Sequence, residues 1–125
     1  MQHHTRFTRY ASAAVLALAL TTPALAADSI KIGIVTFLSG PVAGPFGVPA
    51  KNSADMMVEA INGGKVPGAY SKKGFGGRPI EITIIDEAGG TTKQVEEYRN
   101  LVQRQKVDMV IGYISSGDCL AVAPV

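Results

Sequence analysis

The sequence predicts an α/β fold in which helices cover both faces of a parallel β-sheet. Three apolar runs rich in β-branched residues, at 29–37, 79–86 and 107–111, have the length of buried strands. The first two are each followed, after a glycine-containing loop, by a segment whose apolar residues recur with helical spacing. Because strands and helices alternate at this distance, right-handed crossovers are expected to make the strands parallel.

The first strand alternates apolar side chains at Ile30, Ile32 and Ile34. Val35 and Phe37 add apolar side chains on the opposite face. A strand that is apolar on both faces is typical of a parallel sheet covered by helices on each side.

A Gly/Pro-rich loop at 39–47 leads to the first predicted helix. Pro49 suits the first turn of that helix, because a backbone N–H is not needed there. The helix is expected to end at Asn62, where Gly63 and Gly64 allow a left-handed cap. Its apolar face is expected to consist of Ala50, Ala54, Met57, Val58 and Ile61.

The second strand is expected at Pro79 to Asp86, after a solvated, glycine-rich loop at Lys65 to Arg78. Thr91 and Gln94 have the spacing of a capping box, which predicts a helix start at this point. That helix is expected to bury Val95, Tyr98, Leu101 and Val102.

The third strand is expected at Val107 to Ile111. A polar loop at Gly112 to Asp118 follows it, and then a helical segment from Cys119 to Val125. In parallel sheets, ligands bind outside the carboxyl ends of the strands. The loops that follow the three strands are therefore the places to look for a binding site.

Residues 1–26 have the features of a cleavable Sec signal peptide. Arg6 and Arg9 make its positive end, and Ala11 to Leu20 is its apolar stretch. The alternative is a transmembrane anchor, but crossing a bilayer takes roughly 20 apolar residues and this run is shorter. We therefore expect an exported protein whose mature domain covers residues 27–125.

The net charge of +2 comes from twelve basic and ten acidic residues, and it belongs to the targeting segment. Without residues 1–26, ten basic residues face ten acidic ones. A neutral domain offers no electrostatic basis for binding nucleic acid or an anionic membrane surface. We expect neither as a partner.

Sequence motifs for catalysis and cofactor binding are missing from the expected domain. No Gly-x-Gly-x-x-Gly follows the first strand, and no Gly-Lys-Ser/Thr phosphate loop occurs. His3 and His4 are the only histidines, and both lie in the signal segment. Asp86 and Glu87 form a carboxylate pair without a third metal ligand nearby in sequence, so a structural role is preferred to catalysis. The sequence predicts no enzyme, no cofactor and no metal site.

The loop after the third strand holds the best candidate binding site, Ser115-Ser116-Gly117. Backbone N–H groups and a hydroxyl at a strand-to-helix junction can hold a carboxylate. The alternative is that these serines only cap the helix. The residues by themselves leave both interpretations open.

Six short stretches of the chain follow one another in a characteristic order. They are 30–34 (IKIGI), 38–41 (LSGP) with Phe46-Gly47, 78–81 (RPIE), 86–89 (DEAG), 107–112 (VDMVIG) and 114–117 (ISSG). Together they resemble the N-terminal lobe of the branched-chain amino-acid (Leu/Ile/Val) binding proteins. The resemblance covers nearly all of residues 27–125. It implies a type I periplasmic-binding fold with two lobes, of which this chain would hold part of the first.

The resemblance also implies a function. The protein would be the substrate-binding component of an ABC importer and would capture a small solute in the periplasm. Its partners would be that small-molecule ligand and an ABC permease in the inner membrane, and we expect a monomer. The ligand would be a branched-chain amino acid, or a related amide or aromatic acid. Two alternatives stay open: an exported ligand-sensing domain that feeds a signalling protein, and an exported α/β enzyme.

By the same resemblance, Ser116 matches the serine whose hydroxyl binds the ligand carboxylate. Phe46 lies in the loop where family members carry an aromatic residue against the ligand, although it could instead pack on Pro45. Tyr113 either lines the cleft or packs beneath it. Asp118 departs from the small hydroxyl residue of many relatives, and an acid there would repel a ligand carboxylate by about 1 kcal/mol if solvated and by more if buried.

Cys119 is the only cysteine of the chain. The resemblance implies a disulfide between the positions of Gly89 and Ser115, and that bridge cannot form here. Cys119 could instead pair with a cysteine downstream of Val125, since exported proteins rarely leave a reactive thiol exposed. The other interpretation is a buried thiol that packs as a small hydrophobe.

Overall fold

The structure is a computed structural model that describes residues 28–68 and 71–125. Its strands are β1 (Ile30–Thr36), β2 (Ile80–Asp86) and β3 (Met109–Gly112). Its helices are α1 (Val48–Asn62), α2 (Thr91–Arg99) and α3 (Ser116–Val122), with two π-helical turns, η1 (Ala43–Gly47) and η3 (Asn100–Arg104). The signal peptide predicted at residues 1–26 lies outside the described residues.

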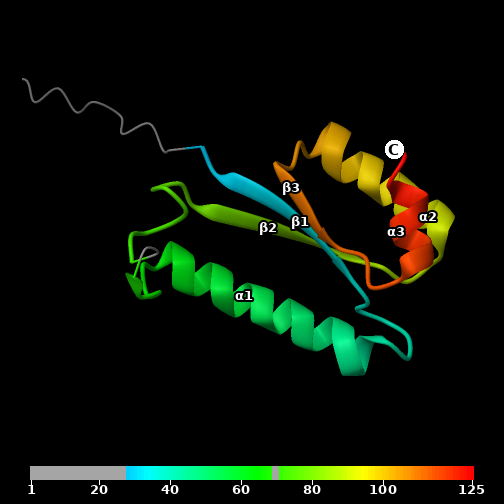
Figure 1. Cartoon of the computed structure of the whole chain (residues 1–125), viewed down its shortest axis with the longest axis horizontal. Coiled ribbons are helices and arrows are strands. Elements are labelled where there is room, and N and C mark those ends of the chain that lie inside the picture. The colour runs from blue at the N-terminus through cyan, green and yellow to red at the C-terminus, as the bar shows by residue number, and fades with distance from the viewer. Residues whose placement is uncertain (1–27, 69–70) are drawn as a thin grey trace, which may run out of the picture.

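The three strands form one parallel sheet in the order β2-β1-β3. In Figure 1, α1 lies on one side of this sheet, while α2 and α3 pack against each other on the other side. Both crossovers therefore leave and re-enter the sheet as expected for right-handed β-α-β units. The predicted fold class, a parallel sheet with helices on both faces, is confirmed.

The register of the sheet brings the carboxyl ends of the strands together. Thr36 at the end of β1 pairs with Asp86 at the end of β2, and Val35 pairs with Gly112 at the end of β3. Gly112 is part of the strand and does not begin the loop, in contrast to the sequence prediction. A Cβ on this residue would overlap the carbonyl oxygen of Val35, so only glycine allows the two strands to approach this closely.

The central contact on the α2 side of the sheet joins Leu101 to β1. Leu101 and Val35 are fully buried. A Cβ on Gly33 would lie only 2.9 Å from Cδ1 of Leu101, so the absence of a side chain at Gly33 makes room for Leu101. Of the other residues predicted to be buried from this helix, Val95 and Tyr98 are half-buried, whereas Val102 is 43% exposed and its prediction is wrong.

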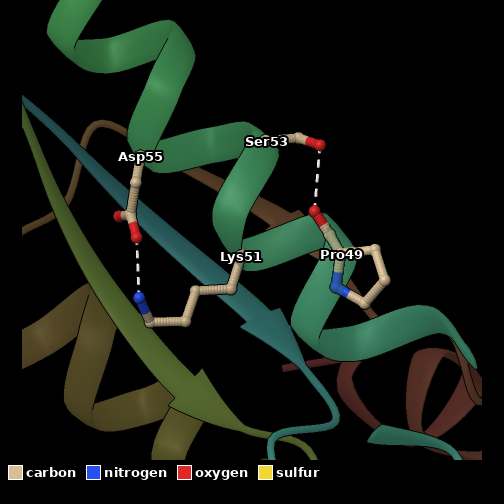
Figure 2. A network of polar contacts seen from close by, with 4 residues as sticks. All are labelled: Pro49, Lys51, Ser53 and Asp55. Atoms are coloured by element: carbon tan, nitrogen blue, oxygen red, sulfur yellow. Dashed lines mark hydrogen bonds and ion pairs between the residues drawn. The ribbon is translucent and has the colours of Figure 1, made fainter. Parts of the chain in front are cut away.

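A short π-helical turn precedes α1. Residues 43–47 form the η1 turn directly before Val48, where the sequence predicted an irregular loop. Gly47 touches the backbone of Phe37 so closely that a Cβ would overlap its carbonyl oxygen. In the first turns of α1, Lys51 Nζ lies 2.6 Å from Asp55 Oδ2, and Ser53 Oγ donates to the carbonyl oxygen of Pro49 at 2.9 Å (Figure 2).

The predicted apolar face of α1 is only partly covered. Ala54, Val58 and Ile61 are half-buried, but Ala50 and Met57 are exposed. The helix is anchored to the sheet at its far end, as Asn62 Nδ2 donates to the carbonyl oxygen of Ile80 at 2.8 Å. Asn62 Oδ1 in turn accepts the N–H of Ile80 at 2.8 Å. The two hydrogen bonds fix the end of α1 to the start of β2.

The capping box predicted at the start of α2 does not form. Thr91 is the first helical residue, the cap is Gly90, and no side chain caps the helix. Gln94 is instead fully buried, and its Nε2 donates to the carbonyl oxygens of Asp86 at 3.2 Å and Glu87 at 2.9 Å. Because Gln94 faces the end of β2, it cannot reach back to the helix start.

The last strand and helix are shifted relative to the sequence prediction. β3 begins at Met109 and not at Val107, because the N–H of Val107 still closes a turn onto the carbonyl oxygen of Leu101 at 3.1 Å. α3 begins at Ser116, three residues before the predicted Cys119, because Ser115 provides the cap. Within residues 28–68 and 71–125, no helix combines the length and hydropathy needed to cross a membrane.

Candidate functional site

Two adjacent acidic residues connect the loops at the carboxyl edge of the sheet. Asp86 ends β2, and Glu87 is the first residue beyond it. Asp86 bonds the loop after β1, and Glu87 bonds the loop after β3. The pair thus connects the end of the edge strand β2 to the loops that follow the other two strands, β1 and β3, which agrees with the structural role preferred from the sequence.

Asp86 uses both of its carboxylate oxygens. Oδ1 accepts the N–H of Leu38 at 2.9 Å and that of Ala88 at 3.0 Å. Oδ2 accepts the hydroxyl of Ser39 at 2.7 Å. Partial burial opposes ionisation, but the bonds from Ser39, Ala88 and Leu38 outweigh it and lower the pKa of Asp86 from 3.8 to about 2. Asp86 is therefore a carboxylate at neutral pH.

Glu87 is fully buried and also uses both oxygens. Oε2 accepts the N–H of Ile114 at 2.9 Å, and Oε1 accepts the N–H of Ser115 at 2.7 Å. Its own N–H donates to the carbonyl oxygen of Thr36 at 2.9 Å, and its carbonyl oxygen accepts from Gln94. The sequence showed the acidic pair but contained no local signal for this long-range contact.

The sequence left two roles open for residues 115–117, helix capping and ligand binding, and the structure assigns the capping role to Ser115. Ser115 is the cap of α3: its Oγ accepts the N–H of Asp118 at 3.3 Å, and its carbonyl oxygen accepts the N–H of Cys119 at 3.0 Å. Ser116 and Gly117 are exposed. Within the described part of the chain, their N–H groups have no acceptor, as at any helix start. Free donors are therefore found at Ser116 and Gly117.

Tyr113 lies beneath the edge of the sheet and not on it. Together with Tyr98, Cys119 and Val122 it lines a hollow of about 450 Å³ between β3 and the α2-α3 pair. Its hydroxyl is buried without a hydrogen-bond partner among the described residues. Burial first, and then the negative charges around it, including that of Glu87, raise the pKa of Tyr113 from 10.0 to about 12. This location favours the second of the two alternatives for Tyr113.

Phe46 belongs to η1, in the connection that follows the carboxyl end of β1. It is 59% exposed, and Pro45 beside it is exposed as well. η1, which contains Phe46, follows the end of β1, and the connection from β3 to α3 lies at the same end of the sheet (Figure 1). The structure thus leaves an apolar ring and a set of free donors on the side where parallel sheets bind ligands.

Asp118 and Cys119 differ from what their sequence positions suggested. Asp118 is only 5% exposed, so it is not the solvated acid considered above. Cys119 is a free, exposed cysteine in the structure, which contradicts the interpretation as a buried thiol. Among the described residues, no three side chains of His, Cys, Asp or Glu are grouped so as to hold a metal ion.

Comparisons with known proteins agree with this architecture. A sequence profile of the family described as periplasmic binding protein matches residues 29–125. The Leu/Ile/Val-binding protein BraC3 of Rhizobium johnstonii is 32% identical over 112 residues, an alignment that covers 90% of this chain and 28% of the relative.

Two solved structures are similar in fold. The substrate binding protein LivJ of a branched-chain amino acid transporter from Streptococcus pneumoniae, in complex with isoleucine, superposes with a TM-score of 0.65 at 29% identity, over 78% of this chain and 25% of that protein. A solute binding protein of an ABC transporter from R. palustris, in complex with benzoate, superposes with a TM-score of 0.59 at 28% identity. The superposition covers 75% of this chain and 23% of that protein. The chain spans about a quarter of the length of the relatives that it matches.

Proposed function

Because the chain belongs to the periplasmic binding protein family, we propose that it captures a small solute in the periplasm for an ABC importer. Residues 27–125 would form part of the N-terminal lobe, and residues 1–26 would direct export. The solute would be held between this lobe and a second one that closes about a hinge. The monomeric, loaded protein would then deliver it to an ABC permease in the inner membrane.

The observation that carries the proposal is the set of unused donors at the carboxyl edge. The exposed hydroxyl of Ser116 and the N–H groups of Ser116 and Gly117 can all donate to one acceptor group. Ser115 differs, because its N–H donates to Glu87 and its Oγ is held at the start of α3, where it accepts the N–H of Asp118. We therefore assign direct ligand contact to Ser116 and Gly117, and a supporting role to Ser115.

The chemistry of these donors points to a carboxylate. Hydrogen bonds from neutral donors to an ionised acceptor are roughly twice as strong as those to a neutral one. Isoleucine and benzoate, the ligands named for the two solved relatives, share a carboxylate attached to an apolar body. In the proposed complex Phe46 covers the apolar body, while Tyr113 supports the loop from beneath.

Asp118 opposes an anionic ligand in this arrangement. Its side chain is only 5% exposed, and its N–H donates to Oγ of Ser115. Because a buried acid repels a nearby carboxylate more strongly than a solvated one, the free donors of Ser116 and Gly117 have to outweigh this repulsion in the proposed complex.

A binding screen of the full-length protein tests the proposal. Isoleucine, leucine, valine and benzoate are titrated by calorimetry, and binding of at least one is expected. Uncharged matched compounds, such as isoleucinamide and benzamide, serve as controls and should bind much more weakly. If all four carboxylates fail to bind, or if the amides bind equally well, the proposed carboxylate site is wrong.

A further inference from the structure

We propose that Glu87 is a positioning residue, which presents the donors of Ser116 and Gly117 by holding the loop before them. The inference rests on the proposed function and deepens it. Glu87 itself cannot touch a ligand, because its side chain is fully buried and both of its oxygens are occupied. Its action on binding would therefore pass through the loop.

The contact spans the sheet. β2 and β3 are not neighbours, because β1 lies between them. Glu87 nevertheless extends from the end of β2 to the N–H groups of Ile114 and Ser115, 27 and 28 residues later in the chain. A single carboxylate thus connects the loop after β3, one edge strand, to the end of β2, the other edge strand.

The loop has a conformation that needs such support. Tyr113, directly before the two bonded N–H groups, has a φ of 64°, which is uncommon for a residue with a bulky side chain. Residues in this region persist only when their surroundings hold them. The N–H of Tyr113 bonds the carbonyl oxygen of Val35 at 3.2 Å, and Glu87 holds the next two N–H groups. Three successive N–H groups are therefore fixed immediately before Ser116.

Glu87 is itself braced on both sides. Its N–H donates to the carbonyl oxygen of Thr36 at 2.9 Å, on the neighbouring strand. Its carbonyl oxygen accepts from Nε2 of the buried Gln94 at 2.9 Å. Because the carboxylate is held in place in this way, it can fix the conformation of the loop before a ligand binds. The entropic cost of ordering the loop on binding is then avoided.

Glu87→Gln is the informative substitution. Glutamine keeps the size of the side chain but has one acceptor oxygen, so its amide N–H group would face the N–H of Ile114 or Ser115. One of the two hydrogen bonds to the loop is thereby replaced by an unfavourable contact between two N–H donors. The measurement uses the full-length protein and those of the four probes (isoleucine, leucine, valine and benzoate) that the parent binds. Affinity is expected to fall about tenfold or more.

Leu101→Val is the matched control. It disturbs a residue that is just as buried, but one that packs on Gly33 in the middle of β1. It should lower the melting temperature as Glu87→Gln does, and leave affinity within about twofold of the parent when measured well below that temperature. Equal losses of affinity in both variants would reduce Glu87 to a general stability role and overturn the proposal.

A double-mutant cycle separates this inference from the proposed function. If Glu87 acts through Ser116, then Glu87→Gln should weaken binding less than about threefold in a Ser116→Ala background. Unchanged affinity in Glu87→Gln, with a loss in Ser116→Ala, would reject the positioning role and leave the site intact. Unchanged affinity in Ser116→Ala would reject the site itself, as would a parent that binds none of the four probes.

Gln94→Met provides a second variant, which is expected to fold even if Glu87→Gln does not. It removes the donor that braces Glu87, and it also removes Oε1 of Gln94, which is buried without a partner among the described residues. Removing Oε1 offsets part of the cost of leaving the carbonyl oxygen of Glu87 without its donor, so the variant should fold with reduced stability, while affinity falls about threefold. Full affinity in Gln94→Met, together with unchanged amide proton shifts of Ile114 and Ser115, would also count against the proposal.

Discussion

Glu87 accepts the backbone N–H of Ser115 at 2.7 Å, although the two residues follow the two outer strands of the sheet, β2 and β3. The bond removes the Ser115 N–H from any contact with a ligand. It also fixes the residue directly before Ser116. The geometry of the candidate site is therefore set in part by a side chain that no ligand can reach.

Ser116→Ala should weaken ligand binding without destabilising the fold. The hydroxyl is exposed and outside the core, and its loss removes one donor to the ligand carboxylate. The expected loss is about 5- to 150-fold in affinity, corresponding to roughly 1–3 kcal/mol. Calorimetry on the full-length protein measures it. Ser53→Ala, on the exposed side of α1, is the control and should bind as the parent does.

Asp86→Asn should change how stability depends on pH. The folded pKa of about 2 lies below the usual 3.8, so ionised Asp86 stabilises the fold above pH 4, and this contribution is lost as the pH falls through 2. Solvent screening limits it to roughly 1–2 kcal/mol.

Chemical unfolding of the full-length protein between pH 2 and pH 6 tests this expectation. The Asp86→Asn variant should lose stability at pH 6 and approach the parent at pH 2. Asp55→Asn, which removes an exposed carboxylate paired with Lys51, is the control and should change stability at pH 6 by less than about 0.5 kcal/mol. A constant difference across the whole range would contradict the assigned pKa.

Gly33→Ala should destabilise the protein by about 1–2 kcal/mol. The added methyl would lie 2.9 Å from Leu101 Cδ1 in a fully buried contact, where overpacking forces side chains off their preferred positions. Thermal or urea unfolding measures the loss, and adding Leu101→Val should recover part of it. Gly44→Ala is the control, because a Cβ there meets nothing within 4 Å. Equal effects at both glycines would argue against the Leu101 contact.

Tyr113→Phe should leave the free energy of unfolding unchanged or raise it by up to about 1 kcal/mol. The hydroxyl is buried without a partner among the described residues, so removing it ends a desolvation cost and breaks no hydrogen bond. Urea unfolding compares the variant with Tyr98→Phe, which removes the hydroxyl of the neighbouring tyrosine in the same hollow. A loss greater than 1 kcal/mol in Tyr113→Phe alone would mean that its hydroxyl has a partner in the full-length protein.

The order of strands and helices could be predicted from the sequence because hydrophobic periodicity is local. The alternation at Ile30, Ile32 and Ile34 marks β1, and that at Ile80 and Ile82 marks β2, whatever lies around them. The same local patterns located the connection between β3 and α3, at the end of which Ser116 lies. The resemblance to a known family then supplied the second lobe and the class of ligand as expectations.

Tertiary structure decided which polar groups are used and which are free. Thr91 and Gln94 have the spacing of a cap, yet Gln94 bonds the end of β2, because that strand end lies within its reach. Ser115 and Ser116 are adjacent and chemically identical, yet only Ser116 keeps its N–H free, because Glu87 takes that of Ser115. These outcomes depend on strand order β2-β1-β3 and on contacts between residues far apart in the chain. Periodicity reports which face of an element is apolar, and it contains no information about a hydrogen-bond partner 28 residues away.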